Sequence, residues 1–366
     1  MGARVATRLG FGDTMIAQAS QLQAMMKPYQ SAQHTVVAFH VKCGKRDIIG
    51  SGPNETGAPC EDLIFEIGSI TKVFTAILLC VQVEDGKIDP DAPISEMSDT
   101  LTDVPHWITP ARLASHTSGL PNFYVPLWKA LLQQQPIGPY ANFTRADLLD
   151  WLQKWRGKKP ASNLRHRYSN LGFGLLGEAM AMQEGKQFSN LLAQKVIRPL
   201  GLSNTTGHLR DDQRPRFMQP RYTNGNAAEP WSFDALAGAG FLRSTPRDLA
   251  RFSGAVIRAL TAPETPLDRA LERSTQPIFS LGHSGGTQPM VQCSGWISAN
   301  GDGATPGMLF ANGGTAGSTC ALYISAEDEG AIGIMSNNGI AASLWASAKL
   351  GRSSPLRRAQ DILSGS

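Results

Sequence analysis

The sequence predicts an α+β fold in which one lobe is assembled from both ends of the chain. Residues 35–49 are typical of a strand, a turn and a returning strand, and residues 318–336 of a second hairpin. A long stretch of helix and loop patterns separates these two regions. We therefore expect residues 1–90 and 230–366 to form a sheet lobe, and residues 91–229 to form a mostly helical lobe. A functional site is expected in the cleft between such lobes.

The N-terminal part begins with a helix pattern and continues with strands. Residues 14–30 place methionine, isoleucine and leucine among polar residues, which predicts an amphipathic helix. The β-branched run at residues 35–41 favours a strand. Residues 44–46 favour a turn, so residues 47–49 are expected to return beside the first strand.

Helix signals dominate the middle of the chain. The apolar run at residues 73–80 contains neither proline nor glycine and predicts a buried helix. Gly86 and the proline that follows it should end this helix. Thr144 stands three residues before Asp147, as in a capped helix start. Further helices are expected over residues 171–182 and 188–197.

The C-terminal part returns to mixed character. Thr245, followed by a proline, predicts the start of another helix. The apolar runs at residues 318–325 and 330–336 flank an acidic turn and predict a hairpin. A last helix is expected over residues 340–350, and the basic, serine-rich end beyond it should be loose.

Composition and charge argue against several kinds of partner. The net charge of +4 comes from scattered basic residues, and the densest group, residues 210–221, also holds two aspartates. We therefore expect no nucleic-acid partner. No apolar run approaches the roughly 18 residues of a membrane helix, so no membrane partner is expected. The cysteines lack metal-ligand spacing, so we expect no metal, and no organic cofactor is implied.

The cysteines and the N-terminus favour a cytoplasmic location. An odd number of cysteines, with Cys80 and Cys320 inside apolar runs, suits reduced thiols. A disulfide between Cys43 and Cys60 stays open. The first eight residues lack the apolar run and cleavage site of a secretory signal.

Ser69 and Lys72 are the first candidates for chemistry. Gly68 precedes Ser69 and the buried helix follows, so Ser69 and Lys72 should share one helix face. A desolvated lysine amine can take the proton of a serine hydroxyl. The free N–H of Ser69 can stabilise an oxyanion. The pattern alone is weak, because a serine at a helix start with a solvated lysine has the same spacing.

A second candidate group, Arg167-Tyr-Ser-Asn170, precedes the helix expected from residue 171. Tyr168 can relay a proton, because a nearby ammonium stabilises its phenolate. Asn170 can hold the Lys72 amine or a substrate carbonyl. The alternative is a tyrosine packed on the core beside a capping asparagine.

With these two groups, the chain resembles the serine β-lactamase and penicillin-binding-protein superfamily, most of all its class C branch of esterases and D-peptidases. The resemblance covers about residues 35–340 and implies a β-lactamase-like fold. That fold is an antiparallel sheet flanked by helices, with an all-helical lobe inserted in the chain. The segments that carry the resemblance occur in the family's order at residues 113–121, 168–177, 199–202, 238–250 and 312–315.

The resemblance also implies roles for the candidate residues. Ser69 would be the nucleophile, with Lys72 and Tyr168 sharing its proton as general base and then acid. Asn170 would position Lys72 and the substrate. Water would then release the acyl group.

The third motif of the family is Lys-Thr-Gly or His-x-Gly, and here Ala311 stands where the Lys or His would be. The backbone contribution survives this change, because the N–H of Gly314 can still complete an oxyanion hole with that of Ser69. The other substrate-binding positions implied by the resemblance are Asn312, Gly313 and Thr315.

Three other motifs and one histidine are rival candidates for the catalytic groups. Tyr222-Thr-Asn224 fits Tyr-x-Asn but precedes no apolar helix, so it is expected to be loop. His283-Ser-Gly285 fits His-x-Gly, and Ser284 also fits a nucleophile elbow. Two prolines bracket that segment and no histidine follows it, so we expect neither role. His116 should hydrogen-bond within the fold, in preference to acting as a base.

We therefore expect a serine hydrolase that forms an acyl-enzyme with a small-molecule ester, amide, thioester or lactam. Ala311 removes the group that would bind a substrate carboxylate, which favours a neutral ester over β-lactams and D-alanyl peptides. Two alternatives stay open. One is an acyltransferase that uses the same machinery in a biosynthetic pathway, with an acyl acceptor as second partner. The other is a non-catalytic scaffold with the same fold.

Overall fold

An antiparallel sheet of eight strands organises the structure, a computed structural model that describes residues 11–124, 138, 140–155, 157, 165–284, 288–299, 307–339 and 355–365. The strands are β1 (Val36–Lys42), β2 (Lys45–Ser51), β5 (Phe279–Ser284), β6 (Gln288–Gln292), β7 (Ile297–Ala299), β8 (Met308–Gly314), β9 (Thr319–Ser325) and β10 (Gly330–Ser336). Their order in space is β2-β1-β10-β9-β8-β7-β6-β5. The α+β fold and the antiparallel sheet expected from the sequence are confirmed.

The two ends of the chain meet inside this sheet. Strand β1 pairs with β2 on one side and with β10 on the other, and Val36 lies opposite Ser336. Both predicted hairpins are present, the second as β9 and β10 around an acidic turn. Every residue of β9 and β10 is buried, because the sheet is covered on both faces.

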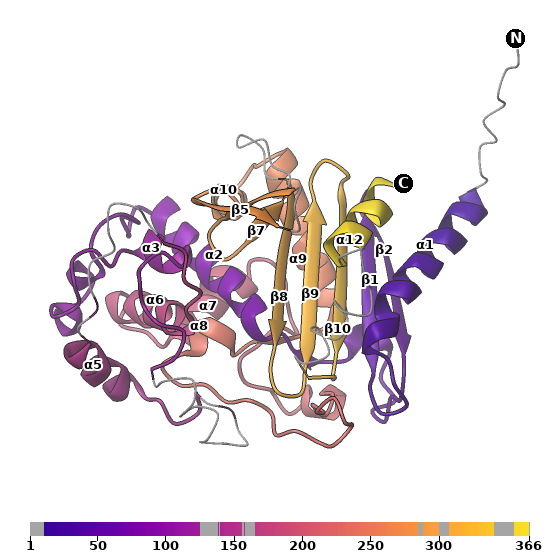
Figure 1. The fold of residues 1–366 in the computed structure, drawn as a ribbon, viewed down its shortest axis with the longest axis horizontal. Coiled ribbons are helices and arrows are strands. Elements are labelled where there is room, and N and C mark those ends of the chain that lie inside the picture. Colours follow the sequence, from indigo (N-terminus) through magenta and orange to yellow (C-terminus); the bar gives the residue numbers. More distant parts are fainter. Residues whose placement is uncertain are drawn as a thin grey trace, which may run out of the picture.

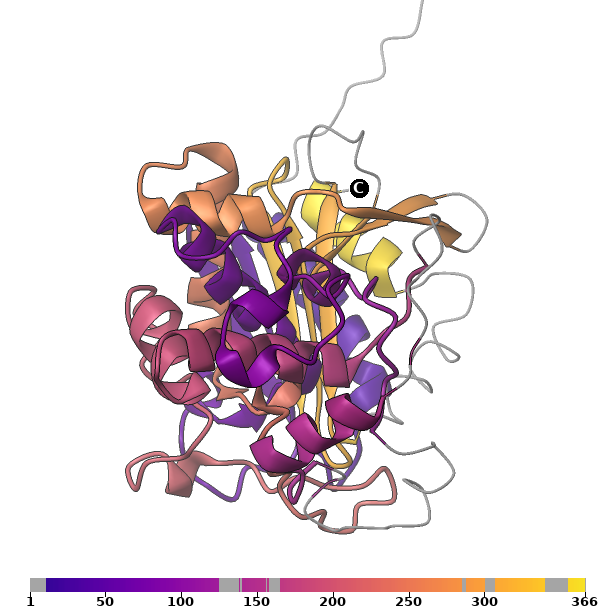
Figure 2. The same cartoon turned by 90° about the vertical axis from the view of Figure 1, so that its left-hand side faces the viewer.

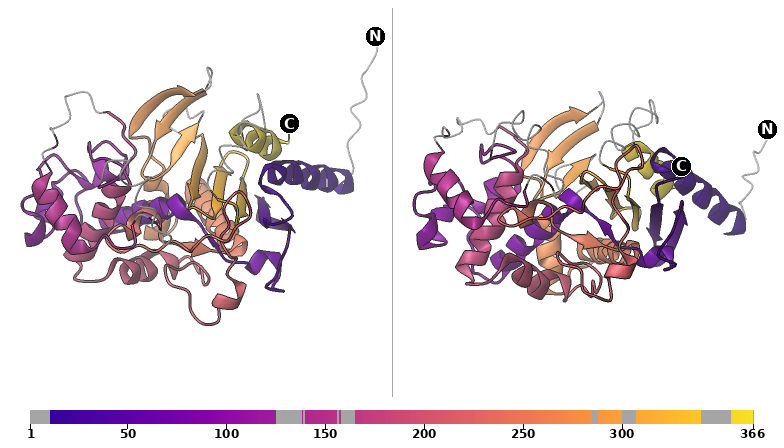
Figure 3. Two further views of the ribbon diagram at one scale, coloured as in Figure 1. Left: turned by 60° about the horizontal axis from the view of Figure 1, so that its bottom comes forward. Right: turned by 90° about the horizontal axis from the view of Figure 1, so that it is seen from below.

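Helices α1 (Phe11–Met26) and α12 (Pro355–Ser364) cover one face of the sheet (Figures 1 and 3). Met25 of α1 and Ile362 of α12 belong to one buried cluster with Ile332 of β10. The predicted N-terminal helix is confirmed, although it ends at Met26, where a 3-10 turn containing Pro28 begins. The helix expected over residues 340–350 lies outside the described residues.

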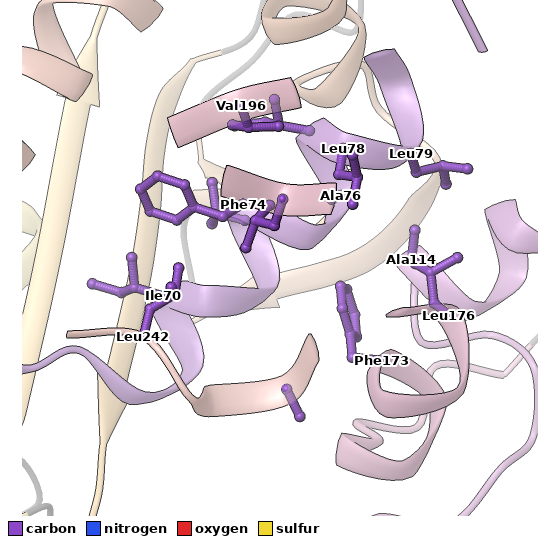
Figure 4. Packing of buried hydrophobic residues seen from close by; sticks show 14 of the residues in the cluster. Ile70, Phe74, Ala76, Leu78, Leu79, Ala114, Phe173, Leu176, Val196 and Leu242 are labelled. Atoms are coloured by element: carbon purple, nitrogen blue, oxygen red, sulfur yellow. The ribbon is translucent and has the colours of Figure 1, made fainter. Parts of the chain in front are cut away.

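The opposite face packs against α9 (Pro246–Thr261), and α2 (Thr71–Glu84) lies between the sheet and the other helices (Figure 1). Nearly all of α2 is buried, which accounts for its continuous apolar sequence. Phe74 of α2 stacks on Phe252 of α9 with ring centroids 4.6 Å apart. Figure 4 shows α2 side chains packed against residues from several other helices, among them Phe173, Leu176 and Val196.

The remaining helices gather beside α2 at the end of the molecule away from α1 (Figure 2). The start predicted at Thr144 is confirmed as a capping box with Asp147. The helix predicted over residues 188–197 ends in a π-helical turn at Ala193–Ile197. These elements are α3 (Pro110–Ala114), α5 (Arg145–Lys154), α6 (Asn170–Gln183), α7 (Phe188–Leu192), α8 (Ala237–Gly240) and α10 (Pro266–Ser274).

Short elements connect the sheet to these helices. A two-stranded sheet pairs β3 (Phe65–Glu66) with β4 (Arg243–Ser244) just before the turn that contains Ser69. The lobe boundaries near residues 91 and 229 stay a prediction. The 3-10 turns lie at Lys27–Tyr29, Cys60–Asp62, Gly68–Ile70, Ile94–Glu96, Asp99–Leu101 and Arg214–Arg216.

The cysteines are all reduced. Cys43 and Cys60 are both free thiols, so the disulfide left open by the sequence is absent. Within the described part of the chain, no helix combines the length and apolar character needed to cross a bilayer. The same residues contain no cluster of three histidine, cysteine or acidic side chains arranged to hold a metal.

Candidate active site

Ser69 lies in a 3-10 turn, Gly68–Ile70, that leads directly into α2. Gly68 has a φ of +49°, and a Cβ atom on it would lie 2.5 Å from the backbone nitrogen of Gly314. Glycine is therefore required here both for the turn and for the close approach of strand β8. The predicted helix start is confirmed in outline, with Ser69 just outside the helix and Lys72 in its first turn.

The structure brings Ser69, Lys72 and Tyr168 together. Lys72 Nζ lies 2.9 Å from Ser69 Oγ, and Tyr168 Oη lies 2.7 Å from the same oxygen. Tyr168 comes from the segment just before α6 and is 41% exposed, whereas Lys72 is buried. The serine hydroxyl thus has two hydrogen-bond partners, one enclosed by the protein and one open to solvent.

Burial and a few polar and aromatic contacts surround the amine of Lys72. Burial lowers the pKa of Lys72, an effect that the nearby Tyr168 partly opposes. Nζ donates a hydrogen bond to the carbonyl oxygen of Ala239 at 2.7 Å and lies 5.8 Å from the centre of the Phe173 ring. The part played by Ala239 could not be predicted from the sequence, because a backbone carbonyl acceptor has no sequence signature.

The prediction that Asn170 holds Lys72 is not what the hydrogen bonds show. Asn170 is the first residue of α6, and its side-chain amide donates to Tyr140 Oη at 2.8 Å. Its backbone N–H donates to Asn122 Oδ1 at 3.2 Å. The Lys72 ammonium instead uses Ala239 as its second acceptor. Asn170 therefore links α6 to Tyr140 at the edge of the site.

His116 packs against the Tyr168 ring and hydrogen-bonds to the residue that follows it. Its Nδ1 accepts the backbone N–H of Ser169 at 3.1 Å, and its ring centroid lies 4.5 Å from that of Tyr168. Burial, reinforced by the charges of Lys72 and His166, lowers the pKa of His116 to about 2. The imidazole therefore stays neutral near pH 7. The expectation that His116 hydrogen-bonds within the fold is confirmed.

Strand β8 lies against the turn Gly68–Ile70, called the nucleophile turn below, as the third-motif assignment requires. A Cβ atom on Gly313 would lie 2.7 Å from the backbone nitrogen of Ser69. Ala311 packs against the buried cluster that contains α2. Asn312, on the opposite side of the strand, is exposed. The backbones of residues 313–314 and 68–69 are thus in direct contact, which suits paired oxyanion donors from Ser69 and Gly314.

The Thr315 hydroxyl makes its hydrogen bond inside the fold, and the role in substrate binding expected from the sequence stays a prediction. Its side chain is buried, and its hydroxyl donates a 2.6 Å hydrogen bond to Glu66 Oε2. Glu66 is itself buried, and its role could not be predicted from the sequence because no motif marks it. The hydroxyl of Thr315 therefore works inside the fold, below the strand that approaches Ser69.

The rival motifs lie elsewhere. His283 and Ser284 belong to β5, an edge strand separated from β8 by β6 and β7. Tyr222 and Asn224 lie in a tight turn, where the N–H of Gly225 donates to the Tyr222 carbonyl. The backbone geometry thus agrees with the rejection of both as parts of the site.

Comparisons with known proteins agree with this geometry. The family model described as Beta-lactamase matches residues 23–348. Over 213 residues the chain is 30% identical to the D-alanyl-D-alanine-carboxypeptidase/endopeptidase AmpH of Escherichia coli, covering 55% of this chain and 50% of that protein. Over 244 residues it is 29% identical to a beta-lactamase of Providencia stuartii, covering 64% and 58% respectively. The chain thus spans about half the length of the curated relatives it matches.

Solved structures show the same fold across nearly the whole chain. A beta-lactamase from a Sulfitobacter species superimposes with a TM-score of 0.76 at 22% identity. The superposition covers 98% of this chain and 100% of the other. The β-lactamase-like fold expected from the sequence is confirmed.

Proposed function

The chain belongs to the beta-lactamase family, and we propose that it is a serine hydrolase that works through an acyl-enzyme on Ser69. The observation that carries this proposal is the pair of short contacts from Ser69 Oγ to Lys72 Nζ and to Tyr168 Oη. A serine with no role in chemistry does not need a buried amine and a phenol at hydrogen-bond distance.

Lys72 acts as the base in the first step. Its buried amine, with a lowered pKa, accepts the Ser69 proton as Oγ attacks the acyl carbonyl carbon. The hydrogen bond to the Ala239 carbonyl fixes the position of the amine. His116 makes no competing base, because burial lowers its pKa to about 2, which leaves the imidazole only weakly basic, and its Nδ1 already accepts the N–H of Ser169.

Two backbone N–H groups stabilise the oxyanion that this attack creates. They belong to Ser69 and Gly314, whose segments meet at the glycine contacts described above. Backbone donors need no particular side chain, so the replacement of the third-motif cation by Ala311 leaves this part of the machinery intact.

Tyr168 completes the cycle. It is the more exposed of the two proton-transfer partners, so it faces the leaving group and delivers a proton to it. The C–O or C–N bond of the donor then breaks and the acyl group stays on Ser69 Oγ. Water then gives a proton to the Tyr168 phenolate as its oxygen attacks the acyl carbon, and the Lys72 ammonium returns its proton to Ser69 Oγ as the acyl–Oγ bond breaks.

We further propose that the preferred acyl donor is a neutral ester. The names of the relatives point to amide and lactam bonds, which the same machinery cleaves. Ala311, however, offers no charge to a substrate carboxylate, and its side chain packs on the core. A donor without a carboxylate loses nothing from this replacement.

Mass spectrometry of the intact protein tests the proposal. We expect incubation with activated neutral esters and with β-lactams to add the mass of the acyl group, more rapidly from the esters. Ser69→Ala should form no adduct and should turn over less than about a thousandth of the wild-type rate. Ser284→Ala, in the distant edge strand β5, is the control and should behave as wild type.

Two outcomes would contradict the proposal: an unmodified wild-type protein with every donor, or a Ser69→Ala protein that keeps its activity. Adding an alcohol or amine to the acyl-enzyme separates hydrolysis from acyl transfer. A hydrolase releases the free acid at a rate that the acceptor hardly changes.

A further inference from the structure

We propose that Glu66 is a positioning residue that fixes the spacing between the two oxyanion donors. This inference rests on the proposed function, because it needs Ser69 and Gly314 to be those donors. Glu66 lies three residues before Ser69, and Thr315 directly follows Gly314. The hydrogen bond from the Thr315 hydroxyl to Glu66 Oε2, 2.6 Å long, therefore ties together the two segments that carry the donors.

Few residues separate this hydrogen bond from either oxyanion donor. From Glu66 the backbone passes through Ile67 and Gly68 to the N–H of Ser69. From Thr315 the backbone runs back through one residue to the N–H of Gly314. The same hydroxyl oxygen accepts the N–H of Gly317 at 3.3 Å, so the turn after β8 is held as well. A shift of the carboxylate would move both halves of the oxyanion hole.

The other carboxylate oxygen holds a third segment. Oε1 accepts the backbone N–H of Trp231 at 2.7 Å and lies 3.7 Å from the guanidinium of Arg243. Arg243 is opposite Glu66 in the β3–β4 pair and donates in turn to the Trp231 carbonyl at 2.7 Å. The backbone N–H and C=O of Trp231 are therefore both held by hydrogen bonds.

Trp231 extends the connection to the wall of the site. Its ring centroid lies 5.9 Å from that of Tyr140, whose hydroxyl accepts the side-chain amide of Asn170. Glu66 thus connects the turn that contains Ser69, the end of strand β8 and the segment of Trp231.

A purely structural role is the rival explanation. The chain contains a suitable control, Glu178, which is also buried and hydrogen-bonded to an arginine, Arg145, at 2.5 Å. Burial raises the pKa of both carboxyls. Glu178 lies within α6 and makes no contact with strand β8 among the interactions described, so its replacement tests the loss of a buried carboxylate alone.

The test measures kcat and KM for an activated neutral ester in Glu66→Gln, Thr315→Val, Thr315→Ser and Glu178→Gln. Rates are divided by the fraction of active sites, counted from the burst of acyl-enzyme. Glutamine has one acceptor oxygen and a donor NH₂ group, whereas the two oxygens of Glu66 accept from Thr315 and from Trp231. Glu66→Gln therefore loses one of these two hydrogen bonds. Misplaced donors cost activity, and we expect kcat to fall about 10- to 100-fold in Glu66→Gln and Thr315→Val, with KM within about threefold.

Three controls separate positioning from stability. Thr315→Ser retains the hydroxyl and should keep kcat within about threefold of wild type. Glu178→Gln should lower the melting temperature without changing kcat per active site. The double variant Glu66→Gln/Thr315→Val should be no slower than the slower single variant, because both changes break one interaction.

Wild-type kcat per active site in Thr315→Val, or an equal loss in Glu178→Gln, would overturn the role of Glu66 and leave the proposed function standing. A wild-type protein that forms no acyl-enzyme with any donor would overturn both.

Discussion

Burial of a single amine sets the pH dependence expected of this site. The pKa of Lys72 lies below its ordinary value because the ammonium is desolvated. Activity needs the neutral amine, so kcat/KM should rise with pH through the folded-state pKa of Lys72. We expect the midpoint of this rise to fall below about 10.4, the value for a solvated lysine. A pH profile with a neutral ester from pH 5 to 11 measures it.

The control for this profile is Lys72→Arg, which keeps the positive charge but cannot release a proton near neutral pH. It should lose activity at every pH. A profile that stays flat across the range, with a folded protein, would show that Lys72 is not the base.

Ala311 should determine the preference for neutral donors. Ala311→His or Ala311→Lys places a donor group beside the nucleophile turn, where a substrate carboxylate can meet it. One charge-assisted hydrogen bond contributes about 1.5–3 kcal/mol, so the ratio of kcat/KM for carboxylate over neutral substrates should rise by about tenfold or more. Both substrates are measured on the same variant. An unchanged ratio would mean that the side chain at position 311 does not face the substrate.

At the scale of residues, the sequence predicts the groups whose spacing is local. Ser69 and Lys72 are three residues apart, and Tyr168 stands next to a recognisable helix start. Partners that depend on tertiary packing could not be predicted. Neither the Ala239 carbonyl beside Lys72 nor the Glu66–Thr315 hydrogen bond leaves a local pattern.

The contact between β8 and the nucleophile turn is the element-scale feature most sensitive to substitution. A Cβ atom on Gly313 would lie 2.7 Å from the Ser69 nitrogen and 2.9 Å from that of Ile70. Gly313→Ala should therefore push the strand away, with about a 100-fold loss of kcat/KM. The free energy of unfolding should fall by about 1–3 kcal/mol. Kinetics and urea denaturation measure the two effects.

Gly254→Ala is the matched control. Gly254 lies within α9, and the nearest atom to an added Cβ is 3.7 Å away at the end of the flexible Arg258 side chain. Alanine in a helix interior is favoured over glycine by about 0.5–1 kcal/mol, so this variant should be slightly more stable and fully active. Equal behaviour of the two variants would refute the packing argument.

Elements with regular patterns were predicted well and irregular strands were not. The β9–β10 hairpin follows from two unbroken apolar runs, whereas β5 and β6 contain glycine, serine and proline. Pro289, one of the two prolines that bracket the His283 segment, lies in β6 opposite His283. Among the described residues the pairing of β6 with β7 begins at Met290, so none of those in β7 requires the N–H that Pro289 lacks.

For the molecule as a whole, we expect a single unfolding transition. One continuous cluster of buried side chains joins Phe39 of the sheet to Leu148 of α5 and Phe173 of α6. Calorimetric and van't Hoff enthalpies should therefore agree. Leu148→Ala, which should cost about 2–5 kcal/mol, should shift the whole transition to lower temperature. Two separate calorimetric peaks would show that the helical lobe unfolds alone.

The global arrangement was the least accessible to local patterns. The order of strand and helix patterns predicted that the two ends of the chain join in one sheet lobe, but the strand order β2-β1-β10-β9-β8-β7-β6-β5 leaves no local pattern. The cytoplasmic location stays a prediction, because nothing in the fold bears on it.

The pairing of Val36 with Ser336 also has a consequence for biosynthesis. A ribosome adds about 5–20 residues per second, so β1 leaves the exit tunnel roughly 15–60 s before β10 exists to cover it. During that interval the apolar strand Val36–Lys42 has β2 as its only available neighbour in the final sheet. Lower growth temperatures and abundant chaperones should therefore raise the soluble yield. Nascent chains stalled before residue 330 should remain sensitive to protease.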